Sequence, residues 1–91
     1  MFDWDVSNLR KIRAHRISRR EVEEALGNDA LLIYSQTVAA EERYVYYGET
    51  NRGRLLAVVL TERADLIRVV TAYDLDAGQK RDYLQQRTLG E

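Results

Sequence analysis

Two short periodicities open the chain. Aromatic and acidic residues alternate over Phe2–Asp5, a two-residue period that predicts an edge strand with one buried face. Val6, Leu9 and Ile12 then lie three residues apart. This second spacing predicts a short amphipathic helix over residues 6–15.

A second helix is indicated by signals at both of its ends. Ser18, followed three residues later by Glu21, matches a capping box, in which a hydroxyl and a carboxylate each accept a backbone N–H at the helix start. A buried stripe begins at Val22. Gly27 is expected to end the helix in the left-handed conformation.

The middle of the chain is predicted to be a β-sheet, because β-branched and aromatic residues dominate it. Asn51–Gly53 predicts a tight turn between two of the strands. Leu55–Leu60 is apolar at every position, so this strand should be central, with both faces or most of one covered. We expect strands over residues 31–34, 43–47, 54–60 and 66–73, with connections at residues 36–40 and 61–65.

Helical spacing returns from about Asp76 and predicts a C-terminal helix that frays over residues 89–91. Short links between sequential strands imply an antiparallel sheet. The predicted fold class is α+β, with two N-terminal helices and a C-terminal helix packed as one layer on an antiparallel sheet of about four to five strands. A chain of 91 residues has room for one small domain, residues 1–91.

Composition narrows the possible chemistry. The chain is 45% hydrophobic and 32% charged, which is the balance of a soluble globular domain. It contains no cysteine, which excludes a disulfide framework, thiol catalysis and zinc sites built on thiolates. We find no signal-peptide pattern and no apolar run long enough for a membrane span. A cytoplasmic protein without a membrane partner is therefore expected.

The net charge of −1 conceals an uneven distribution. Residues 1–20 carry six cations and two acidic residues, whereas residues 21–42 carry six acidic residues and no cation. The basic segment is compatible with phosphate contacts and equally with a solvated helical face. The charge pattern alone favours neither interpretation.

Familiar catalytic motifs are absent from the sequence. His15 is the single histidine, which excludes a nuclease with two catalytic histidines and a metal site with two imidazoles. The five glycines are scattered, so no glycine-rich phosphate loop exists, and no serine lies in a nucleophile elbow. We therefore expect no metal site and no cofactor.

Arginines and tyrosines of the predicted sheet are the remaining candidates. Guanidinium groups bind phosphates and aromatic rings stack on unstacked bases, so this combination suits RNA. RNA cleavage needs no cofactor in principle. The 2′-hydroxyl attacks its own phosphate while a base accepts its proton, an acid protonates the leaving oxygen, and cations stabilise the phosphorane. The residues assigned to RNA binding are Arg43, Arg54 and Tyr46.

Five residues are assigned to the cleavage step itself. Arg63 and Arg68 are the candidate cations that stabilise the phosphorane. Glu62 or His15 is the candidate proton acceptor. Tyr73 is the candidate proton donor or positioning group.

Structural explanations stay open for the same residues. Arg68 lies between apolar residues and could instead pair with Glu62 or Asp65 across the turn. A tyrosine-rich strand is commonly part of a core and its rim. His15 lies at a predicted helix end, where a positive charge is favoured, and this favours a structural role.

Three blocks of the sequence resemble the BrnT-type toxin family. In the first, the pair Trp4-Asp5 precedes an asparagine, a histidine and the short acidic helix. The second, residues 43–63, is similar to a strand–turn–strand unit with a glycine–arginine start and a threonine-x-arginine end. The third, residues 67–83, resembles the last strand and C-terminal helix. Together the resemblance covers about residues 2–84.

The resemblance implies a RelE-like fold and a metal-independent endoribonuclease that inhibits translation, with RNA as its substrate. It also implies a type II toxin–antitoxin pair, in which a cognate antitoxin of the DNA-binding repressor type is the partner. Among the candidate residues, the ones that fall on family positions with arginine or polar side chains are Arg54, Glu62, Arg63 and Arg68.

Two positions depart from the family pattern. The last strand usually has an arginine where this chain has Tyr73, and the loop before the second helix usually has a glycine where it has Arg16. Loss of an arginine that stabilises charge would cost about 2–4 kcal/mol of transition-state binding. Two alternatives therefore stay open: a non-catalytic interaction module of the same fold that binds an antitoxin-like partner, and a small protein that binds single-stranded nucleic acid.

Overall fold

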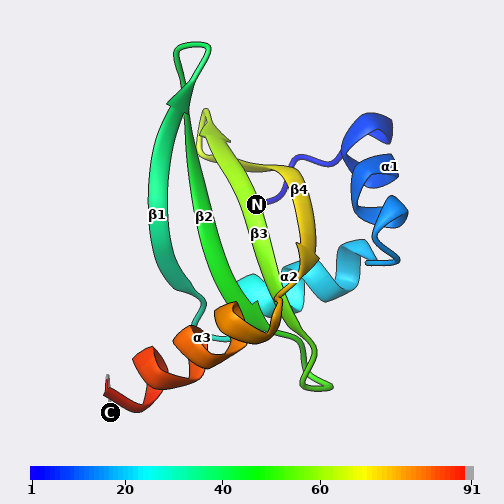
Figure 1. Cartoon of the computed structure of the whole chain (residues 1–91). Helices are drawn as coiled ribbons and strands as arrows, with labels where there is room; N and C mark the ends of the chain where they lie inside the picture. The colour runs from blue at the N-terminus through cyan, green and yellow to red at the C-terminus, as the bar shows by residue number, and fades with distance from the viewer. Residues whose placement is uncertain (90–91) are drawn as a thin grey trace.

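The computed structural model describes residues 1–89, which form three helices and four strands (Figure 1). The predicted α+β class is confirmed. No helix within these residues is long and apolar enough to cross a membrane. Leu89 is helical, and the rest of the segment that was expected to fray lies outside the described residues. In chain order the elements are α1 (Val6–Ala14), α2 (Arg19–Gly27), β1 (Leu31–Val38), β2 (Glu41–Glu49), β3 (Leu55–Arg63), β4 (Leu66–Asp74) and α3 (Ala77–Leu89).

Side chains fix where α1 and α2 begin. Asp5 caps α1 by accepting a 2.8 Å hydrogen bond from the backbone N–H of Asn8. The predicted capping box of α2 is confirmed. The Ser18 hydroxyl accepts from the Glu21 N–H at 3.1 Å, and the Glu21 carboxylate accepts from the Ser18 N–H at 2.9 Å. Loss of the Ser18 cap would destabilise the protein by about 1 kcal/mol.

The C-terminus of α1 is a Schellman motif, with two backbone bonds that turn the chain sharply toward α2. The N–H of Ile17 donates to the Ile12 carbonyl at 3.1 Å, and the N–H of Arg16 donates to the Arg13 carbonyl at 2.9 Å. Ile12 and Ile17 are both buried in the core beneath this turn. Arg16 occupies the left-handed position of the motif, with a φ of 58°.

The C-terminus of α2 differs from the prediction. Gly27 is the last helical residue and not the left-handed stop, so that expectation was wrong. The backbone N–H of Asn28 caps the helix by donating to the Glu24 carbonyl at 3.0 Å. Asp29 has the positive φ, 56°, a conformation that aspartate tolerates because its short side chain can hydrogen-bond locally.

The four strands form an antiparallel meander in the order β1-β2-β3-β4. The predicted turn at Asn51–Gly53 is confirmed, and Gly53 has a φ of 87°. Two-residue turns, Ala39-Ala40 and Ala64-Asp65, join the outer strand pairs with φ values from 49° to 68°, as in type I′ turns. The connections predicted at residues 36–40 and 61–65 were too long, because the strands continue up to these two-residue turns.

The N-terminal segment lies beside β4. The predicted edge strand is reduced to one isolated parallel bridge between Phe2 and Ile67. The rings of Phe2 and Trp4 stack with their centroids 6.1 Å apart, and both residues pack against the core beneath α1 and α2. Because side chains alternate along an extended segment, Asp3 and Asp5 point to the other side.

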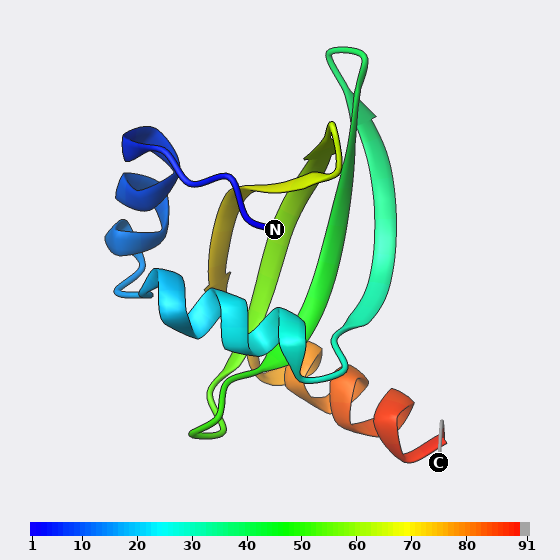
Figure 2. The same cartoon turned by 180° about the vertical axis from the view of Figure 1, so that it is seen from behind.

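Helices cover both faces of the sheet (Figures 1 and 2). On one face, the α1/α2 face, the core includes Ile12, Val22 and Leu56. On the other, the α3 face, Tyr83 is fully buried in a second core that includes Val45. The predicted single layer of helices was therefore wrong. The apolar strand β3 is central, as predicted, because it contributes to both cores.

Close packing of α2 on β2 depends on Gly48. A Cβ atom at this position would lie 2.3 Å from the carbonyl oxygen of Ala25 in α2. Real Cβ atoms do not approach backbone oxygens so closely, and backbone cannot rotate away as a flexible side chain can. Glycine at this point therefore sets how near α2 lies to the sheet.

Candidate functional site

α3 covers one end of the α3 face, and no helix within residues 1–89 covers the other end (Figure 1). Thr61 of β3 pairs with Arg68 of β4, and Arg63 lies two residues further along β3. Directly paired residues and residues two apart share a face, so both arginines point to the same side. With Arg43 of β2 they form a group of three that we call the open-end arginines.

Glu41 joins two of the open-end arginines. Its Oε2 lies 2.6 Å from Nη2 of Arg63, and its Oε1 lies 3.3 Å from Nε of Arg43. These hydrogen bonds, the one from Arg63 above all, lower the pKa of the Glu41 carboxyl below its ordinary value. Glu41 is therefore ionised at neutral pH and offsets part of the positive charge that a phosphate would meet here.

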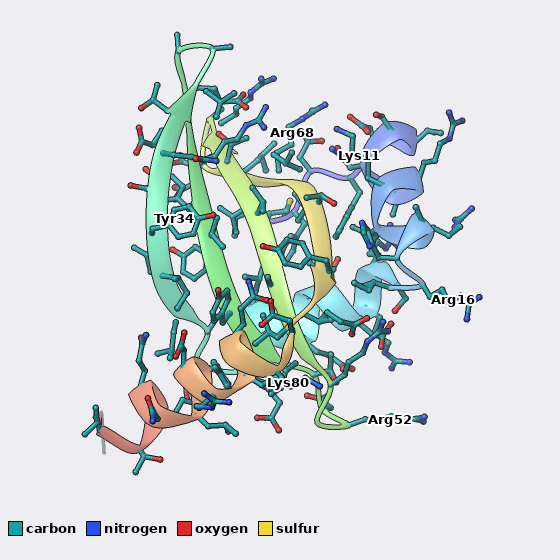
Figure 3. The ribbon with its side chains drawn as sticks, in the orientation of Figure 1. Lys11, Arg16, Tyr34, Arg52, Arg68 and Lys80 are labelled. Atoms are coloured by element: carbon teal, nitrogen blue, oxygen red, sulfur yellow. The ribbon has the colours of Figure 1, made fainter. Side chains whose placement is uncertain are left out.

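Arg68 is paired with the N-terminal segment. Its Nη2 lies 2.5 Å from Oδ2 of Asp5, and its Nη1 lies 3.4 Å from Oδ2 of Asp3. The alternative pairing with Glu62 or Asp65 was wrong, because the extended N-terminal segment lies alongside β4 and reaches Arg68 first. The pKa of Asp5 is lowered, first by the N–H of Asn8 and in smaller part by Arg68. Figure 3 shows Arg68 at the end of β4 that α3 leaves uncovered.

Tyr73 and His15 lie together, away from Arg68. Tyr73 shares the α3 face, and its ring centroid lies 6.5 Å from that of His15, the exposed C-cap of α1. Partial burial, as the main cause, raises the pKa of the Tyr73 phenol, so the hydroxyl keeps its proton at neutral pH. Five residues at about 3.3 Å each separate Tyr73 from Arg68 along β4, or about 16 Å.

Arg54 lies on the α1/α2 face and is bound on several sides. Its guanidinium donates to Asp74 at 2.7 and 3.0 Å, to Glu21 at 3.0 Å, and to the backbone carbonyl of Arg16 at 2.9 Å. The hydrogen bonds to Asp74 are the main cause of its raised pKa. The same bonds lower the pKa of Asp74. Arg54 thus ties the sheet to the turn between α1 and α2.

Glu62 and Tyr46 also lie on the α1/α2 face, apart from the open-end arginines. Together with Leu60 they line a hollow of about 380 Å³ on that side. Glu62 is adjacent to Arg63 on β3, and adjacent strand residues point to opposite faces. A phosphate held by the open-end arginines is therefore out of reach of the Glu62 carboxylate.

Sequence reasoning missed the acidic partners of the open-end arginines, namely Asp3, Asp5 and Glu41. The alternation of Phe2–Asp5 places both aspartates on one side, and this was the available signal. The contact of these aspartates with Arg68, which is more than sixty positions away in the chain, depends on the fold. Within residues 1–89, no three histidine, cysteine, aspartate or glutamate side chains gather closely enough to hold a metal ion.

Comparison with known proteins gives a match to a protein family. No curated protein matches the chain. A family model described as the ribonuclease toxin BrnT of type II toxin–antitoxin systems matches residues 4–78, which is most of the chain. The matched region runs from Trp4, at the start of the N-terminal segment, into α3 and so includes all four strands. This chain therefore belongs to the BrnT family of ribonuclease toxins of type II toxin–antitoxin systems.

Proposed function

We propose that this chain is an endoribonuclease that cleaves RNA without a metal ion, with His15 and Tyr73 as its acid–base pair. The observation that supports the pair is that the two rings are neighbours, with centroids 6.5 Å apart, which brings an accessible imidazole near a protonated phenol. Glu62, the other candidate base, lies on the opposite face of the sheet. Family membership supplies the ribonuclease class.

The cleavage step needs only groups that this pair provides. The unprotonated imidazole of His15 accepts the proton of the 2′-hydroxyl as the 2′-oxygen bonds to phosphorus. The Tyr73 hydroxyl gives its proton to the 5′-oxygen as the P–O5′ bond breaks. The products are a 2′,3′-cyclic phosphate and a free 5′-hydroxyl, so no oxidant, metal ion or cofactor enters the balance.

The open-end arginines lie too far from Tyr73 to serve the same phosphate, at about 16 Å along the strand. We assign Arg43, Arg63 and Arg68 to a neighbouring stretch of the RNA strand. The charges of all three are partly offset by Glu41, Asp3 or Asp5. Their contribution is therefore to position the strand and not to stabilise the phosphorane.

Cleavage of a defined RNA in a buffer that contains a metal chelator tests this function. The parent chain should produce fragments that end in cyclic phosphate. Tyr73→Phe keeps the packed ring and removes the acidic proton, and His15→Gln keeps a polar side chain without a base. Each should lower cleavage by about 10²–10⁴-fold, the range for loss of general acid or base catalysis. Intact RNA with the folded parent chain would contradict the proposal.

Glu41→Gln tests the role of the open-end arginines. The substitution keeps the size of the side chain but removes the carboxylate charge shared by Arg43 and Arg63. If these arginines hold RNA, the variant should bind RNA more tightly than the parent chain at low salt, because two guanidiniums become available. Glu62→Gln, on the opposite face, is the matched control and should leave affinity unchanged. Equal affinities for all three proteins would remove RNA binding from the open end.

We further propose that cleavage inhibits translation in the cytoplasm and that a cognate antitoxin, a DNA-binding repressor, holds the chain inactive. A type II pair requires such a protein partner, and the family supplies that class. Adding the purified chain to a cell-free translation reaction should stop synthesis. His15→Gln should leave synthesis running, and continued synthesis with the parent chain would contradict translation inhibition.

A second candidate function is a non-catalytic interaction module that binds an antitoxin-like partner. The observation that favours it is the pairing of Arg43, Arg54, Arg63 and Arg68 with carboxylates inside the fold. Partner binding does not separate the two functions, because both require it. RNA cleavage does: a module would leave every RNA intact while it still bound its partner.

A further inference from the structure

A groove of about 470 Å³ lies where α1 turns into α2. Its polar rim includes Arg13, Arg16 and Arg19, which are all exposed. Its floor is apolar and is formed by Leu9, Ile12 and Ile17. Figure 3 shows Arg16 at this turn, with its side chain directed away from the sheet. We call this feature the elbow groove.

The arginines of the elbow groove differ from those of the sheet in their partners. Within residues 1–89, none of the three forms an ion pair, whereas Arg43, Arg54, Arg63 and Arg68 all do. Glu21 is the acidic residue that lines the groove. Its carboxylate already accepts from the Ser18 N–H and from Arg54. The groove therefore presents three positive charges to solvent with little internal neutralisation.

Arg16 occupies a backbone position that favours glycine. Its φ of 58° lies in the left-handed region, and a residue with a Cβ pays about 1–2 kcal/mol to adopt it. The left-handed position of a Schellman motif is usually glycine for this reason. Solubility would be served equally by a cation at any exposed position on α1. A charged side chain at a strained position points to a role for that charge at this place.

We propose that the elbow groove binds the phosphate backbone of single-stranded RNA and delivers the strand to His15. The inference rests on the proposed ribonuclease function. His15 is the C-cap of α1, so it lies at the same turn as the elbow groove, although it does not line it. Guanidiniums above an apolar floor suit RNA, because the cations take the phosphates while the floor accepts an unstacked base.

RNA fits the elbow groove better than an acidic protein segment does. The RNA of the proposed reaction needs cations near the acid–base pair, and the open-end arginines are too distant and partly neutralised. Acidic protein binding is nevertheless a distinct outcome of the experiment below.

The experiment measures binding of a 2′-O-methylated RNA oligonucleotide, which cannot be cleaved, over a range of salt concentrations. Arg16→Gly removes one charge and relieves the strained backbone, so the variant should unfold at the same temperature as the parent chain or higher. It should bind the oligonucleotide more weakly. Arg13→Ala/Arg16→Gly/Arg19→Ala should reduce the slope of log K against log salt by about 2, or about 0.7 for each phosphate that the variant no longer neutralises.

The matched control is Arg81→Ala, which removes an exposed cation from α3, on the opposite face of the sheet. This variant should keep the affinity and salt slope of the parent chain. Weaker binding by Arg16→Gly alone, without loss of stability, supports the elbow groove. Equal slopes for the parent chain and the triple variant overturn it.

Three further outcomes are informative, and the first two separate this inference from the proposed function. If the parent chain cleaves unmodified RNA and the triple variant cleaves and binds RNA equally well, RNA binding by the elbow groove is overturned and the ribonuclease function stands. Binding without cleavage, with the slope reduced in the triple variant, supports the groove and overturns the ribonuclease. If the triple variant loses affinity for poly-glutamate, a model of an acidic protein segment, but keeps the parent chain's slope of log K against log salt for RNA, the elbow groove is not an RNA site.

Discussion

Arg54→Ala should destabilise the protein strongly, because Arg54 joins the sheet to the turn between α1 and α2. Its bidentate bonds to Asp74 involve a carboxylate whose side chain is 55% exposed, so this pair is worth at most about 1 kcal/mol. The Glu21 side chain is less exposed, at 30%, and its ion pair with Arg54 contributes a similar amount. In the variant, the backbone carbonyl of Arg16 also loses the hydrogen bond that Arg54 donates to it. We expect a loss of about 2–3 kcal/mol in unfolding free energy.

Urea denaturation at several pH values measures this loss. The pKa of Asp74 is lowered mainly by Arg54, and the pKa of Glu21 is lowered by the Ser18 N–H first and then by Arg54. A lowered carboxyl pKa stabilises the folded state above the unfolded-state value, near 4, and this contribution disappears as the pH falls through the folded-state pKa. The difference between Arg54→Ala and the parent chain should therefore be full at pH 7 and shrink below about pH 4.

Arg52→Ala, in the neighbouring turn, is the control and should change stability by less than about 0.5 kcal/mol. The reasoning fails if Arg54→Ala unfolds at the same urea concentration as this control. It also fails if the deficit of Arg54→Ala is the same at pH 7 and at pH 3, because the carboxylate partners would then contribute nothing.

Three further predictions concern the fold. Ala40→Gly should stabilise the protein or leave its stability unchanged, because it relieves a left-handed alanine. Ala14→Gly in α1 should instead lower the unfolding free energy by about 0.5–1 kcal/mol. Thermal denaturation compares the two variants, and equal losses of stability would contradict the turn geometry. Gly48→Ala should cost more than about 2 kcal/mol because its Cβ would meet the backbone of α2, whereas Gly27→Ala meets nothing and should stabilise. Asp5→Asn should flatten the loss of stability between pH 5 and pH 2, since the carboxyl with the lowered pKa is gone; an unchanged acid profile would refute this.

Local signals predicted the elements that they specify directly. The capping box at Ser18 and the spacing of apolar residues in α1 depend only on neighbours in the chain, and both were correct. The connection predicted at residues 36–40 contains the turn at Ala39-Ala40 but was too long, because alanine is not a turn residue and did not mark where the strands end. Its left-handed conformation is imposed by the pairing of β1 with β2. Length of strand was therefore underestimated wherever a turn lacked glycine or asparagine.

The candidate site was predictable in part. Strand alternation alone separates Glu62 from Arg63, so the exclusion of Glu62 was available before the structure. The proximity of His15 to Tyr73 was not, because it depends on how α1 packs beside β4. The partners of Arg68 likewise required the N-terminal segment to be placed next to the last strand.

The uneven charge of the sequence acquires a physical meaning in the fold. Acidic residues of α2 are engaged in contacts within the fold: Glu21 with Arg54, Glu23 with the Trp4 indole at 2.8 Å, and Glu24 with the Asn51 N–H at 3.1 Å. In the part of the chain that the structure describes, the basic side chains at the end of α1 form no such bonds. The net charge of −1 therefore understates the positive charge at the elbow groove, where three arginines face a single carboxylate, that of Glu21.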